Sequence, residues 1–321
     1  MLSRDRKNAA ATSSSRWLRR LSWAASLAVL GLAGWLVQHT LASLAWHDVA
    51  AAWARLSARQ VATSIACTAV SFALLALFDV LAARTAVPGR VSAARAAFAG
   101  AVSLGVSNTL GFHALTGGAV RYRIYASAGL GAGDVARIVG LAGLGVGLGF
   151  AVVITGTLCW QPALGQGWGR LPGALLLVLL AALLLWLWLR RRPRTLRLWR
   201  WTLVFPAAGT AALQMLLGGV EMLAAIGALY VLLPAGVAPP FVDFVPVYVG
   251  AVLVGIASHS PGGLGVFETI MLAAFPATAR PDLLAALLCY RLTYGLLPFA
   301  LAGVALGAFE LRERRRKTAG P

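Results

Sequence analysis

The sequence is poor in charge. Only 12% of its 321 residues are Asp, Glu, Lys or Arg, against roughly a quarter in ordinary globular domains. Hydrophobic residues make up 60% of the chain, and its mean hydropathy is +0.79. So little polar surface does not suit a water-soluble domain, whereas a bilayer accepts apolar helices of about 20 residues. The sequence therefore predicts an all-α fold, a polytopic membrane helical bundle.

Residues for metal binding and for soluble catalysis are also scarce. The three cysteines are scattered, and the four histidines form no cluster with carboxylates, so neither a disulfide framework nor a metal site is expected. A nucleophile elbow and a Walker loop are both missing. The glycine run "GLAGLGVGLG" at 140–149 lacks a strand before it, which favours a helix-packing face over a nucleotide site. We therefore predict no catalytic residue, cofactor or metal.

Most of the charge that is present is positive, with a formal net charge of +18. Most of the 28 Lys and Arg lie in three blocks beside apolar runs, at 4–20, 190–200 and 312–317. This distribution is typical of cytoplasmic flanks of membrane helices and argues against a nucleic-acid surface. Contact with anionic headgroups is the alternative role. The sequence thus predicts a basic arm (1–19), a transmembrane domain (20–310) and a basic tail (311–321), with both termini cytoplasmic.

Hydropathy predicts eight apolar segments: 20–38, 60–83, 96–120, 136–160, 172–189, 203–233, 243–275 and 283–309. If the basic blocks are cytoplasmic, 96–120 must enter from the cytoplasm and turn back, because arginines follow it at 121, 123 and 137. The same reasoning makes 243–275 enter from the outer face. About six full spans plus two Gly/Pro-broken re-entrant hairpins of opposite entry result, which would form an inverted repeat. Eight full spans is the alternative, with Arg121 and Arg123 then near the outer face.

The two predicted hairpins carry similar breaks, "SNTLGFHALTGGAVRYR" at 107–123 and "ASHSPGGLGVFE" at 257–268. Proline removes a helical N–H, and paired glycines permit unusual backbone angles. Unwound backbone is tolerated at membrane depth only when it is buried in protein or lines a watery cavity. Paired breaks of this kind point to the central site of a transporter; close helix packing is the alternative. The predicted turn residues are Thr116, Gly117 and Gly118 in the first break and Pro261, Gly262, Gly263 and Gly265 in the second.

Ionisable residues inside the membrane are costly and usually functional. Arginine suits a phosphate because its planar fork stays ionised. The candidate headgroup-binding residues are Arg121, Arg123, Tyr122, His113, Glu268, His259 and Arg291; for the two histidines, packing is the alternative. Secondary candidates are Asp79 and Glu221, although Asp79 can instead pair with Arg84. For Glu268 four alternatives remain: pairing with Arg291, pairing with Arg121, contact with a cationic headgroup, or an inert protonated carboxyl.

Three stretches are similar to a known family: "GFHALTGGAVRYRIYASAGL" (111–130), "SHSPGGLGVFETIML" (258–272) and the less specific "LFDVLAAR" (77–84). They resemble the membrane domain of the bacterial lysylphosphatidylglycerol synthase/flippase family, over roughly 20–310. The resemblance implies a multi-pass protein of the bacterial cytoplasmic (inner) membrane. It also implies function for Arg121, Arg123, Glu268 and the glycines around them.

In that family a soluble domain transfers an amino acid to phosphatidylglycerol, and the membrane domain moves the product to the outer leaflet, which weakens cationic antimicrobial peptides. Only 311–321 follow the membrane part here, so the expected activity is that of the translocase half without the transferase. The implied substrate is aminoacyl-phosphatidylglycerol or a related anionic or polyprenyl lipid. The expected partners are this membrane phospholipid or lipid-linked substrate, a separate lipid-modifying transferase and a second copy of the chain. A non-transporting scaffold or accessory subunit of a lipid-modifying enzyme is the alternative.

Overall fold

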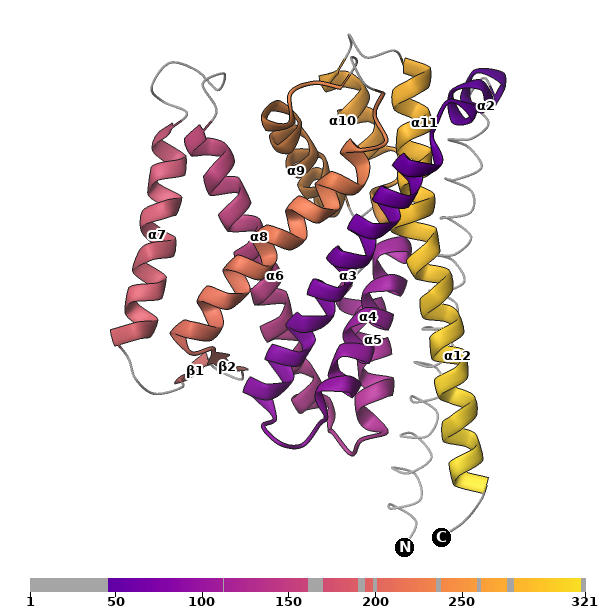
Figure 1. The fold of residues 1–321 in the computed structure, drawn as a ribbon. Helices are drawn as coiled ribbons and strands as arrows, with labels where there is room; N and C mark the ends of the chain where they lie inside the picture. The colour runs from indigo at the N-terminus through magenta and orange to yellow at the C-terminus, as the bar shows by residue number, and fades with distance from the viewer. Residues whose placement is uncertain are drawn as a thin grey trace, which may run out of the picture. The chain divides into compact units, whose positions relative to one another are not determined.

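The computed structural model describes residues 46–111, 113–160, 170–189, 194–198, 201–234, 238–258, 261–275 and 280–318, which are mostly helical (Figure 1). The predicted span 20–38 and the basic arm lie outside the described residues. The elements are α2 (Trp46–Ala54), α3 (Ala58–Ala86), α4 (Ala93–Leu110), α5 (His113–Ala126), α6 (Ala132–Trp160), α7 (Arg170–Leu189), β1 (Arg194–Leu198), β2 (Trp201–Phe205), α8 (Ala208–Tyr230), α9 (Phe241–Ala257), η2 (Pro261–Gly263), α10 (Val266–Ala274), α11 (Arg280–Tyr290), η3 (Arg291–Leu296) and α12 (Leu297–Thr318).

Five helical stretches in the described residues are long and apolar enough to cross a membrane. They are Ala58–Ala86, Ala132–Cys159, Leu171–Leu189, Ala208–Tyr230 and Pro281–Arg315. These match five of the segments predicted as full spans. The two segments predicted to be broken are not among them, because 96–120 is divided into α4 and α5, and 243–275 into α9, η2 and α10. The described chain is therefore a polytopic helical membrane protein, as the sequence predicted.

One departure from the all-helical prediction lies in the middle basic block. There β1 and β2 pair antiparallel, with Arg194 opposite Phe205 and Leu198 opposite Trp201. The pair takes up the start of the segment predicted at 203–233, so α8 begins only at Ala208. Its sequence, "RTLRL" and "WTLVF", is rich in β-branched and aromatic residues, which favour extended backbone. Hydropathy alone did not separate these residues from the helix that follows.

Close helix packing at glycines holds α6 against α3 and α8. A Cβ on Gly149 would lie 2.5 Å from the Cα of Gly218, and a Cβ on Gly145 would lie 2.5 Å from the ring of Phe78. Both distances are shorter than any real Cβ contact, so these positions need glycine. The prediction that 140–149 forms a packing face is confirmed, since small residues let membrane helices approach closely.

The buried apolar residues form two clusters, and each broken segment belongs to a different one. Tyr248 of α9 and Phe267 of α10 lie in a cluster with residues of α8 and α11. Val102 of α4 and Ile124 of α5 lie in a cluster with residues of α3, α6 and α12. In Figure 1 α4 and α5 are drawn toward the lower end of the bundle, and α9 and α10 toward the upper end. The long helix α8 of the first cluster packs against the long helix α3 of the second, which joins the two clusters.

Candidate functional site

The first broken segment is a hairpin of α4 and α5. Helix α4 ends at Gly111, whose φ of 75° is accessible to glycine and whose N–H donates to the carbonyl of Ser107 at 2.8 Å. Helix α5 starts at His113, and the Thr116 hydroxyl donates back to the Gly111 carbonyl at 2.8 Å. The break therefore comes earlier than predicted, because Thr116, Gly117 and Gly118 lie within α5 rather than in the turn.

Gly117 does not form the turn; it lets α5 lie close to α4. A Cβ there would lie 3.4 Å from the Cβ of Ser107 on α4 and 3.1 Å from Nη1 of Arg121. A side chain would therefore press on both helices of the hairpin. The neighbouring Gly118 has open space instead. Close helix packing, the alternative given for the glycines of this motif, therefore applies to Gly117 and not to Gly118.

Arg121 lies inside the bundle, where it forms a bidentate ion pair with Asp79 of α3. Its Nε and Nη2 donate to the two carboxylate oxygens at 2.8 and 2.6 Å, and the Tyr125 hydroxyl donates to Oδ1 at 3.3 Å. The side chains of Arg121 and Asp79 are only 8% and 0% exposed. Asp79 therefore pairs with Arg121, and the predicted pairing with Arg84 is wrong. Glycine at position 100 makes room for the carboxylate, because a Cβ there would lie 2.8 Å from Oδ2.

Arg123 and Tyr122 face away from this buried pair. Arg123 donates to Glu310 of α12 at 2.6 Å, with side chains 44% and 31% exposed, and Tyr122 is half exposed. His113 contacts the amide oxygen of Asn108 at 3.0 Å. The sequence had grouped these residues with Arg121 as a headgroup site, but Arg121 is buried against α3 and Arg123 lies at the surface against α12. Headgroup binding by Arg123, Tyr122 and His113 stays a prediction.

The second broken segment joins α9 to α10 through η2. Gly262, Gly263 and Gly265 have φ angles of 58°, 65° and 79°, in the left-handed region that favours glycine. Helix α10 then begins at Val266, and the Gly265 N–H donates to Glu268 Oε2 at 2.8 Å. The predicted turn residues in this segment therefore do form the turn. His259 lies outside the described residues.

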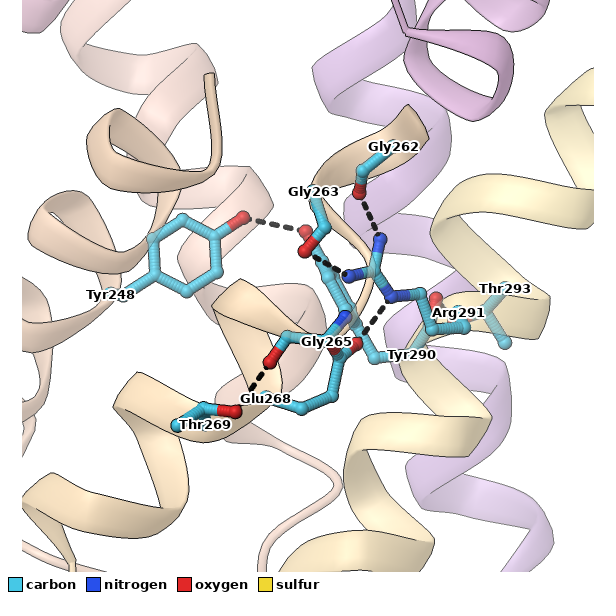
Figure 2. A network of polar contacts seen from close by, with 9 residues as sticks. All are labelled: Tyr248, Gly262, Gly263, Gly265, Glu268, Thr269, Tyr290, Arg291 and Thr293. Carbon is cyan, nitrogen blue, oxygen red and sulfur yellow. Dashed lines mark hydrogen bonds and ion pairs between the residues drawn. The ribbon is translucent and has the colours of Figure 1, made fainter. Parts of the chain in front are cut away.

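Arg291 holds this turn together, as Figure 2 shows. Its Nε donates to Glu268 Oε1 at 2.7 Å, and its Nη1 donates to the Gly262 carbonyl at 2.6 Å. A longer contact of 3.4 Å joins Nη2 to the Gly263 carbonyl, and the guanidinium lies 5.5 Å from the centre of the Phe267 ring. Of the four alternatives for Glu268, pairing with Arg291 is confirmed and pairing with Arg121 is wrong. Unlike the first pair, this one stays partly accessible, with side chains 24% and 15% exposed.

Arg291 also begins η3, a π-helical stretch between α11 and α12. A π-helical turn is a local departure from α-helix that is frequent at functional sites. The helical stretch from α11 to α12 is therefore irregular at Arg291, the residue whose side chain bonds to the turn of the second break.

The two broken segments meet backbone to backbone. A Cβ on Gly262 would lie 3.0 Å from the carbonyl oxygen of Thr109, in the last turn of α4. The Thr109 hydroxyl donates to the Gly295 carbonyl of η3 at 3.2 Å. The end of α4, the turn at η2 and the irregular stretch η3 therefore converge. Sequence reasoning predicted two related breaks but not that they touch.

Sequence reasoning missed a buried polar network beside this junction. Ser71 of α3 donates to Glu221 Oε1 at 2.7 Å and contacts the Tyr294 hydroxyl at 2.9 Å. The Tyr294 ring stacks on Tyr290 with centroids 5.0 Å apart, and the Tyr290 hydroxyl lies 2.5 Å from that of Tyr248 (Figure 2). The available signal was the spacing of Ser64, Thr68 and Ser71, which places three hydroxyls on one face of an apolar helix.

No metal-binding grouping of three or more His, Cys, Asp or Glu side chains occurs among the described residues. The three cysteines are unpaired. In the part of the chain that is described, the functional groups of the site are therefore arginine guanidiniums, carboxylates and tyrosine hydroxyls. These groups can bind charged and hydrogen-bonding parts of a molecule and can exchange protons.

These features define a polytopic helical membrane protein with two broken helices that meet beside a charged pair. Residues 23–302 match the family described as "Lysylphosphatidylglycerol synthase TM region", and the chain belongs to that family. It is 32% identical to the uncharacterized protein slr0712 of Synechocystis over 285 residues, covering 85% of this chain and 88% of that protein.

Two further relatives match over shorter lengths. The chain is 29% identical to the inner membrane protein YbhN of Escherichia coli over 192 residues, 57% of this chain and 59% of that protein. It is also 35% identical to the phosphatidylglycerol lysyltransferase of Staphylococcus aureus over 103 residues, 30% of this chain and 12% of that protein. The resemblance predicted from the glycine motifs is thereby confirmed.

Proposed function

We propose that this protein is a lipid translocase that moves aminoacyl-phosphatidylglycerol, or a related anionic or polyprenyl lipid, between leaflets. The observation that carries the proposal is the contact of Gly262 with the Thr109 backbone beside the partly exposed pair of Arg291 and Glu268. Non-helical backbone within a membrane needs burial or a watery cavity. Paired breaks of this kind mark substrate sites in transporters.

The proposed topology has six full spans and two re-entrant hairpins of opposite entry. The ends of α3 and α5 and the start of α6 carry arginines on one side of the bundle, which favours the cytoplasm for that side. Helices α4 and α5 then enter from the cytoplasm, and α9 and α10 enter from outside, as in an inverted repeat. Figure 1 draws these two hairpins toward opposite ends of the bundle. We place both termini in the cytoplasm and the protein in the inner membrane, where a relative is named as residing.

Arg291 and Glu268 are the proposed headgroup contacts. An aminoacyl-phosphatidylglycerol carries a phosphate and at least one amino group. If the pair opens, the Arg291 guanidinium can bind the phosphate and the Glu268 carboxylate can bind the amine, so both charges of the site stay compensated. His113, near the end of α4, offers a further polar contact. Arg121 is proposed to position α5 instead, because its Nε and Nη2 are already bonded to Asp79.

The comparisons support transport rather than aminoacyl transfer. The matched family describes a transmembrane region, and the similarity to a lysyltransferase covers 12% of that enzyme. We propose that a separate transferase supplies the lipid and that this chain moves it.

A proteoliposome assay tests this function. Vesicles of phosphatidylglycerol with a trace of amine-bearing aminoacyl-phosphatidylglycerol report translocation as the growing fraction of amine that an impermeant reagent labels. We expect the wild type to speed labelling over empty vesicles, and Arg291→Ala and Glu268→Gln to slow it at least about tenfold, roughly 1.4 kcal/mol of lost stabilisation. Arg90→Ala, which removes an ion pair with Asp134 outside both breaks, is the matched charge control.

Three results separate the alternatives. Wild-type rates that equal those of empty vesicles overturn the translocase. If such vesicles still retain the lipid on the protein, the non-transporting scaffold is favoured. Faster labelling that survives both Arg291→Ala and Glu268→Gln overturns the assignment of the headgroup site while leaving translocation in place.

A further inference from the structure

Glu221 is a buried carboxylate that the proposed headgroup site does not use. It lies in the middle of α8, is 6% exposed and packs against Ser71 of α3 and Tyr294 of η3. Both neighbours donate to the same oxygen, Oε1, at 2.7 and 3.4 Å. The other oxygen, Oε2, accepts no hydrogen bond among the described residues.

Among the residues that the structure describes, no cation pairs with Glu221 to compensate its charge. Within the described chain Glu221 forms no ion pair, in contrast with Asp79 and Glu268, each of which pairs with an arginine. The titratable groups that face it are Tyr294 from η3 and Tyr248 from α9, and the serine hydroxyl of Ser71 comes from α3. On the facing helices α6 and α7, positions 138–158 and 171–189 hold no ionisable residue. A carboxyl in such a setting is a common proton carrier of membrane transporters.

The same groups connect Glu221 to the headgroup site. Tyr294 belongs to η3, the short π-helical stretch whose first residue is Arg291. Tyr294 stacks on Tyr290, and the Tyr290 hydroxyl meets Tyr248 next to the glycine turn (Figure 2). Thus η3 carries both Tyr294, which bonds to Glu221, and Arg291, which bonds to the turn of the second break.

We propose that Glu221 binds and releases one proton in each transport cycle and thereby couples lipid movement to a transmembrane pH gradient. This rests on the proposed translocase function and adds its energy source. The proton binds to Oε2, which takes the carboxylate from a charge of −1 to 0, and it leaves as a proton to water. No bond to the lipid forms or breaks.

The coupling works through hydrogen bonds of the ionised carboxylate. Ionised Glu221 accepts charge-assisted bonds from Ser71 and Tyr294, which tie η3 to α3 and α8. Bonds of this kind are about twice as strong as those between neutral groups. Protonation weakens them and frees η3 to shift, and Arg291 moves with it. This segment is π-helical, a local departure from α-helix that is frequent at functional sites.

The proteoliposome assay described above, run with and without an imposed pH gradient, tests the coupling. We expect the gradient to speed amine labelling by wild type at least about fivefold, the lower end of typical coupling between sites. Glu221→Gln keeps the shape of the side chain but cannot ionise. It should still move lipid down a concentration gradient and should show no acceleration by the pH gradient. Asp134→Asn, which removes a carboxylate at the surface end of α6, should respond like wild type.

Wild-type translocation with equal rates in both conditions overturns the proton coupling and leaves the translocase standing. An unchanged acceleration in Glu221→Gln overturns the assignment to Glu221. Vesicles in which wild type moves no lipid under either condition overturn the translocase itself, and the coupling with it. Proton flux into wild-type vesicles, read with a trapped pH dye while lipid moves, needs no variant; a constant internal pH during translocation also overturns the coupling.

Discussion

Each of the two broken segments contributes one member of an arginine–carboxylate pair, and the two pairs lie in different environments. Arg121 of α5 pairs with Asp79 of α3, and Glu268 of α10 pairs with Arg291 of η3. The Asp79–Arg121 pair is almost fully buried, whereas the Glu268–Arg291 pair is partly exposed. The hydrogen bonds of the first pair join side chains: Arg121 bonds to both oxygens of Asp79, and the Tyr125 hydroxyl adds one bond to Asp79. In the second, the arginine also binds the carbonyls of the turn. The first pair therefore fastens helices, whereas the second joins a side-chain pair to the backbone carbonyls of a turn.

The two broken segments also differ in what their glycines do. At the first break, Gly100 makes room for the Asp79 carboxylate and Gly117 lets α5 lie on α4. At the second, the positive-φ glycines Gly262, Gly263 and Gly265 shape the backbone of the turn itself. A buried pair that loses one partner leaves an uncompensated charge, whereas a partly exposed pair can be rescued by water. This contrast is why we propose the second pair, rather than the first, as the one that exchanges its charges with a ligand.

The largest effect is expected from Asp79→Ala. It leaves the Arg121 guanidinium buried without its carboxylate, which should lower the free energy of unfolding by about 3–5 kcal/mol. Thermal unfolding of the purified protein in detergent measures the loss. The double variant Asp79→Leu with Arg121→Leu is the control, because removing both charges together should recover most of it. A single variant as stable as the wild type would show that this pair does not fasten α5 to α3.

Gly262→Ala should have the next largest effect. A side chain at φ 58° is strained, and its Cβ would lie 3.0 Å from the Thr109 carbonyl oxygen. Such strain costs about 1–3 kcal/mol, and it should separate the two breaks and slow lipid translocation. Gly118→Ala is the matched control, because that helical position has open space and alanine there should be neutral or stabilising. Equal loss in the two variants would mean that contact between the breaks is irrelevant.

Glu268→Ala should destabilise the protein less than Asp79→Ala does. Arg291 keeps its bonds to the Gly262 and Gly263 carbonyls and some access to water, so we expect a loss of about 1–2 kcal/mol. Translocation should fall far more than stability does. Unfolding temperature and labelling rate, measured on one preparation, separate the two effects. If Glu268→Ala proved as destabilising as Asp79→Ala, the contrast between a fastening pair and an exchangeable pair would be lost.

The sequence predicted the five spans found in the described residues and the second turn, because both depend on local properties. Long apolar runs specify membrane helices whatever lies around them. A proline followed by two glycines and a third glycine specifies a turn at η2 on its own. The pairing of Glu268 with Arg291 was among the alternatives because few partners exist inside the membrane.

The buried pair could not be predicted in this way. Asp79 and Arg121 are 42 residues apart on two different helices, and their contact depends on the small residue at Gly100. Arg84, only five positions from Asp79, was the natural local choice, but helical rotation carries the two residues apart. The Ser71–Glu221–Tyr294 network likewise joins three helical segments. Such contacts arise from tertiary packing. In the sequence, only the spacing of the hydroxyl residues on α3 indicates that a polar network forms there.

Arg123→Ala should have the smallest effect on the free energy of unfolding, because it removes an exposed ion pair, whereas Asp79→Ala removes a buried one. The pair of Arg123 with Glu310 is roughly half exposed, and exposed pairs contribute about 0–1 kcal/mol. Salt screens exposed charges much more than buried ones. The small difference in unfolding temperature between wild type and Arg123→Ala should therefore vanish at about 1 M salt, where the Debye length is about 3 Å. The loss caused by Asp79→Ala should persist at the same salt concentration. A difference for Arg123→Ala that survives high salt would show that this arginine acts through packing on α12, or through bound lipid, rather than through its exposed charge.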